Sequence, residues 1–144
     1  MDFSEATNFT ADLIGERVSQ VWRGAGTAIF LELGSIEPAR SGRGRGGSGC
    51  IGVEWSWRVE RGASILGGSF SEDQDISSMV ESLQGLTVQS IAFFGRIPEI
   101  EVGFASGDRL LSFSTVEGDP EWSIRVADRY LSVVSGLFVY ESAA

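Results

Sequence analysis

The sequence has no histidine and no lysine among its 144 residues, and Cys50 is its single cysteine. Without histidine, the chain has no Ser–His or Cys–His nucleophile pair and no His-ligated metal site. Without lysine, it has neither Schiff-base chemistry nor a phosphate loop of the Walker type. One cysteine makes no internal disulfide and no structural zinc site. We therefore expect no cofactor and no metal, and only carboxylates, tyrosine and arginine remain for catalysis.

Long hydrophobic runs are also missing. No segment approaches the ~18–20 consecutive apolar residues that a membrane-spanning helix needs. The N-terminal sequence MDFSEATNFT contains acidic residues but no basic ones, so it does not have the pattern of a signal peptide. Together with the single cysteine, these absences favour the cytoplasm as the compartment and predict no membrane partner.

Positive charge is scarce. The chain has 20 acidic residues against 11 basic residues, all of them arginine, and its net charge is −9. A surface of this sign repels phosphate backbones, so we expect no nucleic-acid partner. It suits a basic protein partner, because complementary charge accelerates association. Solubility alone is the simpler explanation of the same charge.

Two stretches have the pattern of an amphipathic helix. Ser71 and Gln74 have the spacing of a capping box, and apolar residues follow at i, i+3, i+4 and i+7. Acidic residues in the first turn complement the helix dipole, and Gly85 is placed to end the helix. Residues 2–14 predict a second helix, which Gly15 ends.

Most of the remaining sequence alternates between apolar and polar residues, as β-strands do. The alternation is clearest in residues 29–34 and 99–104, and clusters of glycine, serine and aspartate separate the runs. If residues 93–94, two phenylalanines, lie in a strand, one of the two rings faces away from the core. The expected fold class is α+β, with a mainly antiparallel sheet on which two helices pack, in a single domain over residues 1–144.

One strand pattern occurs twice, as EWSWRV at residues 54–59 and as EWSIRV at residues 121–126. In each copy the apolar side chains share one face of the predicted strand. These faces carry Trp55, Trp57 and Val59 in the first copy, and Trp122, Ile124 and Val126 in the second. The first interpretation of the three tryptophans is packing in the core. The second is an aromatic pocket between two halves of the chain, for a small apolar ligand.

The likeness extends upstream of the repeated strand. Gly15 precedes two valines, Val18 and Val21, at the spacing with which Gly85 precedes Val88 and Ile91. We therefore interpret the chain as an internal duplication of two similar helix-plus-β-meander halves, at approximately residues 1–70 and 71–144. Coincidence is the alternative, because polar–aromatic alternation is common in half-buried strands.

The segment ARSGRGRGGSGC, residues 39–50, contains the glycine spacing of a dinucleotide-binding loop. Such a loop joins a strand to a helix, but here Pro38 precedes it and a β pattern follows, so we exclude a dinucleotide site. Arg40, Arg43 and Arg45 alternate with glycine as in segments that bind RNA loosely, but without their aromatic residues. The simplest interpretation is a long hairpin loop. The functional alternative makes these three arginines a binding loop for an anionic ligand or partner surface.

Carboxylates that could act in pairs have no diagnostic spacing. The candidate pairs are Glu99 with Glu101, Glu54 with Glu60, and Asp119 with Glu121. Acidic residues at alternate positions of a strand usually form a solvated face. We therefore predict no catalytic residues, and an enzyme that uses carboxylates alone is the last of three hypotheses.

The C-terminal half carries one resemblance. From Gly85 to Tyr140 the sequence combines G-x-x-V-x-x-I, a Ser-Gly-Asp turn, W-S-I-R-V and a closing apolar strand. It resembles small uncharacterised bacterial α+β proteins, some of them suspected immunity proteins that neutralise partner toxins. The resemblance implies an interaction protein and carries no catalytic residue across.

Three functions are thus compared. The leading hypothesis is a non-catalytic binding protein of the bacterial cytoplasm whose partner is another protein, with an immunity-like inhibitor as its sharpest version. The alternative is a small-molecule binding domain with an aromatic pocket between the halves, and a carboxylate enzyme comes third. The sequence leaves the oligomeric state open, because exposed sheet edges would allow a dimer but no residue demands one.

Overall fold

The computed structural model describes residues 2–35 and 48–142. Within these ranges the chain forms two α-helices, one 3-10 turn and eleven β-strands. The helical elements are α1 (Phe3–Thr10), η1 (Ala11–Leu13) and α2 (Asp73–Leu83). The strands are β1 (Val18–Arg23), β2 (Ile29–Leu33), β3 (Gly49–Val53), β4 (Trp57–Arg61), β5 (Ser64–Gly68), β6 (Val88–Phe94), β7 (Glu99–Phe104), β8 (Arg109–Ser112), β9 (Trp122–Val126), β10 (Arg129–Val134) and β11 (Leu137–Ser142).

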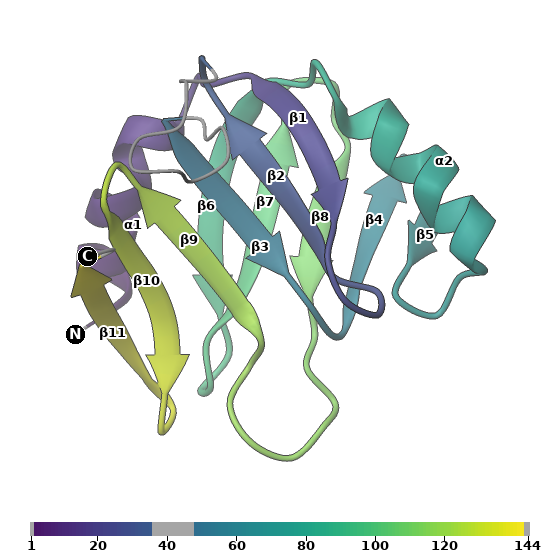
Figure 1. Cartoon of the computed structure of the whole chain (residues 1–144). Helices are drawn as coiled ribbons and strands as arrows, with labels where there is room; N and C mark the ends of the chain where they lie inside the picture. Colours follow the sequence, from purple (N-terminus) through teal and green to yellow (C-terminus); the bar gives the residue numbers. More distant parts are fainter. Residues whose placement is uncertain (1, 36–47, 143–144) are drawn as a thin grey trace.

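The strands form two sheets that pack face to face (Figure 1). One sheet has six strands in the order β1-β2-β3-β9-β10-β11, and the other has five in the order β5-β4-β8-β7-β6. The ladder pairings are all antiparallel. The expected α+β class with mainly antiparallel strands is therefore confirmed, but the chain builds two sheets where the sequence analysis expected one. The helices lie at opposite sides of the sandwich, with α1 near β6 and β9 and α2 near β1 and β5.

Each sheet takes strands from both halves of the sequence. Strands β1 to β3 belong to the six-stranded sheet, and the chain then crosses over to add β4 and β5 to the other. Strands β6 to β8 belong to the five-stranded sheet, and the chain then crosses back to add β9 to β11 to the first. The two sheets are therefore tied together by the chain itself, and one hydrophobic core lies between them.

The segments that follow the two helices bind one another reciprocally. The Gly15 N–H donates to the Val88 carbonyl at 2.8 Å, and the Gly85 N–H donates to the Val18 carbonyl at 2.8 Å. Both glycines have the left-handed backbone that ends a helix, with φ of +90° and +88°. The glycine stops predicted from the sequence are thus confirmed, and they also join the two sheets.

Helix α2 begins one residue later than its capping-box pattern predicts. Its N-cap is Glu72 rather than Ser71, and no side chain caps it. The Ser71 hydroxyl instead accepts the Gly68 N–H at 3.0 Å, which holds the turn that enters the helix. The predicted apolar stripe is confirmed, because its four residues are all buried, namely Ile76, Met79, Val80 and Leu83.

The repeated EWS strand is shorter in the first copy than its alternation predicts. Strand β4 begins at Trp57, so Trp55 lies in the connection that precedes it. Trp57 is fully buried and Trp122 nearly so, while Trp55 is only partly buried. The predicted shared buried face of Trp55 and Trp57 is therefore wrong. Alternation holds within a strand, and Trp55 lies outside one.

Other strand predictions are confirmed. Residues 29–34 and 99–104 contain β2 and β7, and the inward-facing residues of both strands are fully buried. In β6, Phe93 is 8% exposed and Phe94 is 40% exposed, so one ring of the pair does face outward. Among the described residues, neither helix is long and apolar enough to cross a membrane.

Candidate functional site: the crossover end of the sandwich

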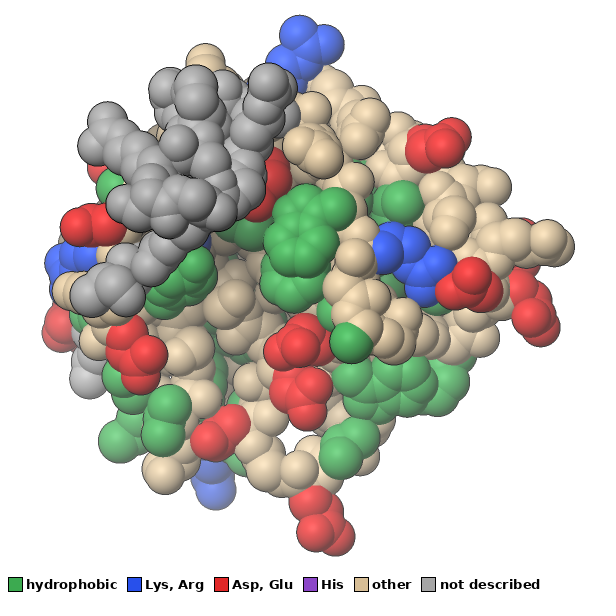
Figure 2. Space-filling view, in the orientation of Figure 1, with side chains coloured by type: hydrophobic (Ala, Val, Ile, Leu, Met, Phe, Trp, Pro, Cys, Tyr) green, Lys and Arg blue, Asp and Glu red, His purple; other side chains and the backbone are tan. Residues whose placement is uncertain are grey.

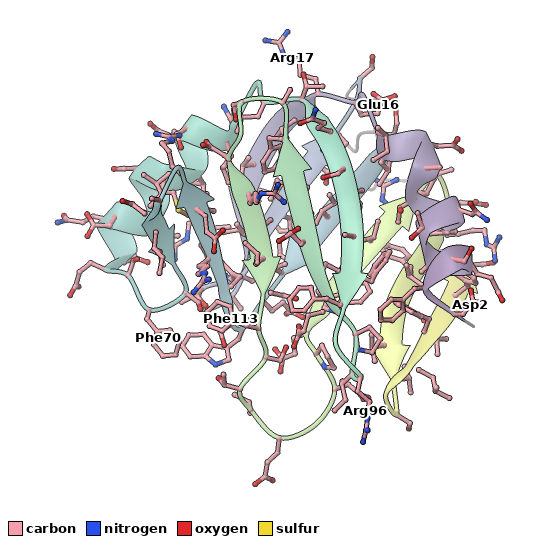
Figure 3. All side chains as sticks on the ribbon, turned by 180° about the vertical axis from the view of Figure 1, so that it is seen from behind. Asp2, Glu16, Arg17, Phe70, Arg96 and Phe113 are labelled. Carbon is pink, nitrogen blue, oxygen red and sulfur yellow. The ribbon has the colours of Figure 1, made fainter. Side chains whose placement is uncertain are left out.

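Connections of both sheets gather at one end of the sandwich, the lower end in Figure 1. We call it the crossover end, because both connections that pass between the sheets lie there. Figure 3 labels Phe70, Phe113 and Arg96 at this end. The crossover end comprises residues 54–56, 69–72, 95–98, 113–121 and 135–136.

The two crossings lie against each other. The Glu54 N–H donates to the Glu121 carbonyl at 2.9 Å, and the Phe113 N–H donates to the Ser56 carbonyl at 2.9 Å. A side-chain bond reinforces them, because the Ser56 hydroxyl donates to the Phe113 carbonyl at 3.2 Å. The Thr27 hydroxyl donates to the Glu54 carbonyl at 3.1 Å and links the β1–β2 turn to the same place. The surface at this end therefore rests on fixed backbone.

The second crossing, residues 113–121, is longer than the first, residues 54–56. Its far end is anchored by Asp119, whose carboxylate accepts the N–H groups of Ser135 and Gly136 at 2.9 and 3.1 Å. Its near end is anchored by the Glu99 carboxylate, to which the N–H and the hydroxyl of residue 114, a serine, both donate. The middle of this crossing stays at the surface.

Apolar side chains are exposed at the crossover end. Phe70 is 71% exposed, and its ring packs on Trp55 with the two ring centroids 4.5 Å apart. Val116, in the middle of the long crossing, is 57% exposed, and Ile97 is 53% exposed. Single exposed apolar residues are ordinary, and these three lie on three different connections of the crossover end.

Carboxylates lie among these apolar side chains. Glu54, Glu72, Glu117 and Glu121 are all exposed. Among the residues that the structure describes, no salt bridge involves any residue of the crossover end. Figure 2 shows acidic and hydrophobic side chains side by side toward this end of the molecule. The four carboxylates therefore have no salt-bridge partner among the described residues, although the exposed Arg96 lies at the same end.

The outer face of the five-stranded sheet is different. Its charges are paired along the surface, Arg58 with Glu60 at 2.7 Å and Arg109 with Glu101 at 2.9 Å. A pocket of about 280 Å³ opens beside the β4–β5 hairpin, lined by Arg58, Glu60 and residues 62–65. Because the charges that line it already bind each other, they present little uncompensated charge to a ligand.

The structure separates the three tryptophans that the sequence grouped. The indole of Trp57 donates to the Thr27 carbonyl at 3.0 Å, and that of Trp122 donates to the Pro98 carbonyl at 2.9 Å. Both are core residues. Only Trp55 reaches the surface, where it contacts Phe70 at the crossover end. The candidate loop residues Arg40, Arg43 and Arg45 lie outside the described residues.

The candidate carboxylate pairs have separate partners. Glu99 binds two serines, whereas Glu101 binds Arg109. Glu60 binds Arg58 in β4, whereas Glu54 lies at the crossover end. Asp119 is engaged by backbone N–H groups, whereas Glu121 is exposed. Over residues 2–35 and 48–142, no group of three or more Cys, Asp or Glu side chains is placed to hold a metal ion.

Sequence reasoning missed Phe70. A signal was present, because Phe70 stands between a glycine pair and the polar start of α2, in a segment with the composition of a turn. An aromatic ring in a turn is either folded back into the core or displayed. Only the tertiary structure distinguishes these outcomes, and it leaves the ring exposed.

The single cysteine lies on the outer face of the six-stranded sheet. Cys50 is beside Glu32 and Arg125, and burial, together with the Glu32 carboxylate, raises the pKa of its thiol to about 12. Glu32 is itself buried, and it accepts hydrogen bonds from the Trp22 indole at 3.2 Å and from Arg125 at 3.3 Å. A thiol with such a raised pKa is a poor nucleophile at neutral pH.

The chain matches no protein-family model, and no curated protein or solved structure matches it.

Proposed function

We propose that this is a non-catalytic binding protein of the bacterial cytoplasm whose crossover end docks a basic protein partner. In its sharpest form it is an immunity-like inhibitor that covers a basic toxin. One observation carries the proposal: exposed apolar side chains occur at the crossover end together with exposed carboxylates that form no salt bridge with the described residues.

The two kinds of side chain have complementary roles in docking. Protein interfaces depend on a few aromatic or apolar anchor residues that lose their water when the partner binds. Phe70, which packs on Trp55 and is exposed, has the character of such an anchor. Carboxylates around the anchor accelerate the approach of a basic partner and disfavour acidic ones. The net charge of −9 acts in the same direction at longer range.

The length of the second crossing supports the same surface. Three residues, 54–56, connect β3 in one sheet to β4 in the other. A connection of three residues is therefore long enough to pass between the two sheets. Residues 113–121 make the corresponding passage from β8 to β9. Their additional length is not needed to span the sheets, and it displays Val116 and Glu117. Residues that closure of a fold does not require are available for binding.

The proposal includes the internal duplication inferred from the sequence. Three features support it: the reciprocal bonds of Gly15 and Gly85, the matching hydrogen bonds of two buried indoles, and the order of the strands. Under this proposal Trp57, rather than Trp55, is the counterpart of Trp122, and the EWS motifs are offset by two residues. The two crossings then correspond, and the second carries the additional segment.

A pocket for a small ligand gains no support from the tryptophans. Trp57 and Trp122 belong to the packed core, and both indole N–H groups have backbone partners. Trp55 packs on Phe70 near the surface rather than facing the other two.

The test is capture of the partner from a lysate of the protein's own host, followed by binding measurements with the purified pair. We expect a stoichiometric basic protein that is released by salt. Phe70→Ser should weaken its affinity at least about tenfold, as loss of an interface anchor does. Glu117→Lys should slow association and reduce the salt dependence.

Phe94→Ser is the matched control, because Phe94 is also an exposed aromatic residue but lies on the five-stranded sheet. It should leave the affinity unchanged. A partner that binds the Phe70 and Glu117 variants as tightly as the wild type would exclude the crossover end as its docking surface. The absence of any stoichiometric protein, or an acidic partner, would overturn the proposed function.

A further inference from the structure

An aromatic stack lies on the outer face of the six-stranded sheet. Trp22 and Phe30 are direct cross-strand neighbours in β1 and β2. Their rings are nearly parallel, with an interplanar angle of 14° and centroids 4.1 Å apart. Trp22 is 41% exposed although Phe30 covers one side of it. The opposite face of the indole is therefore the accessible one.

Two glycines make room for this stack. A Cβ atom at Gly24 or at Gly52 would lie 2.7 Å from the Phe30 ring, closer than any real contact of that kind. Phe30 consequently lies flat against the backbone, and Trp22 lies flat on Phe30. A side chain at either glycine would lift both rings away from the sheet.

The indole is also fixed in rotation. Its N–H donates to a carboxylate oxygen of Glu32 at 3.2 Å, and Arg125 holds another oxygen of the same carboxylate at 3.3 Å. Arg125 in turn donates to the Ala127 carbonyl at 2.8 Å. Donation to a carboxylate pushes electron density into the indole ring, which strengthens the negative face that a cation meets.

The other sheet shows that the fold does not need the stack. The β6–β7 hairpin has the same register as β1–β2, including a β-bulge after its first residue pair. The residues that pair there where Trp22 pairs with Phe30 are Ala92 and Glu101. Glu101 forms a surface salt bridge with Arg109 at 2.9 Å. A hairpin of this geometry is therefore stable with small and charged residues on its outer face.

We propose that the exposed face of Trp22 is a binding site for a cationic side chain, an arginine guanidinium in the first place, of the basic partner. This inference rests on the proposed function and deepens it. Guanidinium is planar and weakly hydrated, so it stacks on an indole better than ammonium does. The site adjoins the crossover end, because the turn after Trp22 is bonded through the Thr27 hydroxyl to the Glu54 carbonyl.

Charge decides which flat ligand the ring receives. Nucleobases also stack on tryptophan, but they arrive with phosphates, which a chain of net charge −9 repels. A cation is attracted by the same field and by the face of the ring. The acidic surface and the fixed indole thus select the same class of ligand.

The test uses the full chain and two small probes, N-acetyl-arginine amide and its neutral isostere N-acetyl-citrulline amide. The four tryptophan indole N–H signals are followed by ¹⁵N NMR during titration, and Trp22→Phe assigns the Trp22 signal. We expect that signal to move saturably, with the arginine probe binding about twofold to fivefold more tightly than the citrulline probe. The Trp22→Leu variant has no indole signal at this position, so the backbone amide signal of Gly52 is followed instead. That signal should no longer distinguish the arginine probe from the citrulline probe.

Phe94→Leu is the matched control, because Phe94 is 40% exposed but lies on the other sheet. It should leave the titration unchanged. An equal response to both probes, or arginine-induced shifts that do not include Trp22, would overturn the inference. Because this titration contains no protein partner, its failure leaves docking at the crossover end intact. If the arginine preference is seen but capture finds no partner, the arginine site on Trp22 stands, while the proposed function and the assignment of that arginine to a protein partner fail.

Discussion

Trp57 and Trp122 make the same hydrogen bond in two different parts of the core. The indole N–H of Trp57 donates to the Thr27 carbonyl, which lies in the turn between β1 and β2. That of Trp122 donates to the Pro98 carbonyl, which lies in the turn between β6 and β7. Each tryptophan therefore joins a sheet to a hairpin of the other sheet, and both bonds lie under the crossover end.

Replacing either tryptophan by phenylalanine should destabilise the protein to a similar extent. The ring becomes smaller in a packed core, and one backbone carbonyl, that of Thr27 or of Pro98, loses the indole N–H that donates to it. We expect Trp57→Phe and Trp122→Phe each to lower the free energy of unfolding by about 2–3 kcal/mol. Urea unfolding measures the change. Phe94→Leu, at the surface of the other sheet, is the control and should cost below about 1 kcal/mol. A similarly small change at Trp57 or Trp122 would contradict the role of these bonds.

The raised pKa of the Cys50 thiol predicts slow alkylation. Burial and the neighbouring Glu32 carboxylate raise this pKa from 9.0 to about 12, so the native protein holds almost no thiolate near pH 8.5. Iodoacetamide should react with Cys50 at least about a hundredfold more slowly than with a free thiol, and at the free rate in urea. Mass spectrometry of the quenched reaction measures it. Fast alkylation of the native protein would show that the thiol is accessible as thiolate.

The same thiol predicts a loss of stability in alkali. Because the pKa is raised on folding, the native state keeps a proton that the unfolded state loses above about pH 9. The contribution of Cys50 to stability is therefore fully present below pH 9 and is lost as the pH rises toward 12. From pH 9 to pH 11, wild type should lose about 1 kcal/mol per pH unit more than Cys50→Ala. Parallel pH profiles of the two proteins would contradict this assignment.

The long second crossing should be dispensable for folding. Replacing residues 113–121 by Glu-Trp-Ser, the sequence of residues 54–56, supplies a connection that already spans the two sheets once. We expect the shortened protein to unfold cooperatively in urea, with a lower midpoint because the anchors at Asp119 and Glu99 are lost, and to lose affinity for the captured partner. Circular dichroism and the purified binding pair provide the measurements. Failure to fold would show that the additional length is structural.

The Asp119 anchor should hold the long crossing in place. Asp119→Ala removes two hydrogen bonds to the turn of residues 135–136, one of them to Ser135 at 2.9 Å. We expect a loss of about 1–2 kcal/mol of stability, and faster proteolysis within residues 113–121. Glu117→Ala, in the same crossing, has no such bond and should change neither. Equal proteolysis of the two variants would show that Asp119 does not fix the crossing.

Short-range patterns in the sequence determined the elements themselves. The apolar stripe of α2 and the alternation in β2 and β7 appear in the structure where the periodicity placed them. Gly15 and Gly85 also follow the helical segments where the sequence predicted them to. This could be predicted because the left-handed backbone conformation after a helix is a requirement on a single residue, which glycine meets. The N-cap of α2 was displaced by one residue because the Ser71 hydroxyl had a competing partner in the turn before it.

The tertiary structure decided which sheet each strand joins and what the surface displays. Periodicity shows which side chains share a face, but it does not say which strand will pair with another far along the chain. Three features depend on such distant pairings. Each sheet takes strands from both halves of the chain, Trp57 is buried where Trp55 is not, and Phe70 is exposed. The amount of negative charge was fixed by composition alone. The placement of Glu54 and Glu121 beside each other at one end arose only when the two crossings met, because that contact joins residues far apart in the chain.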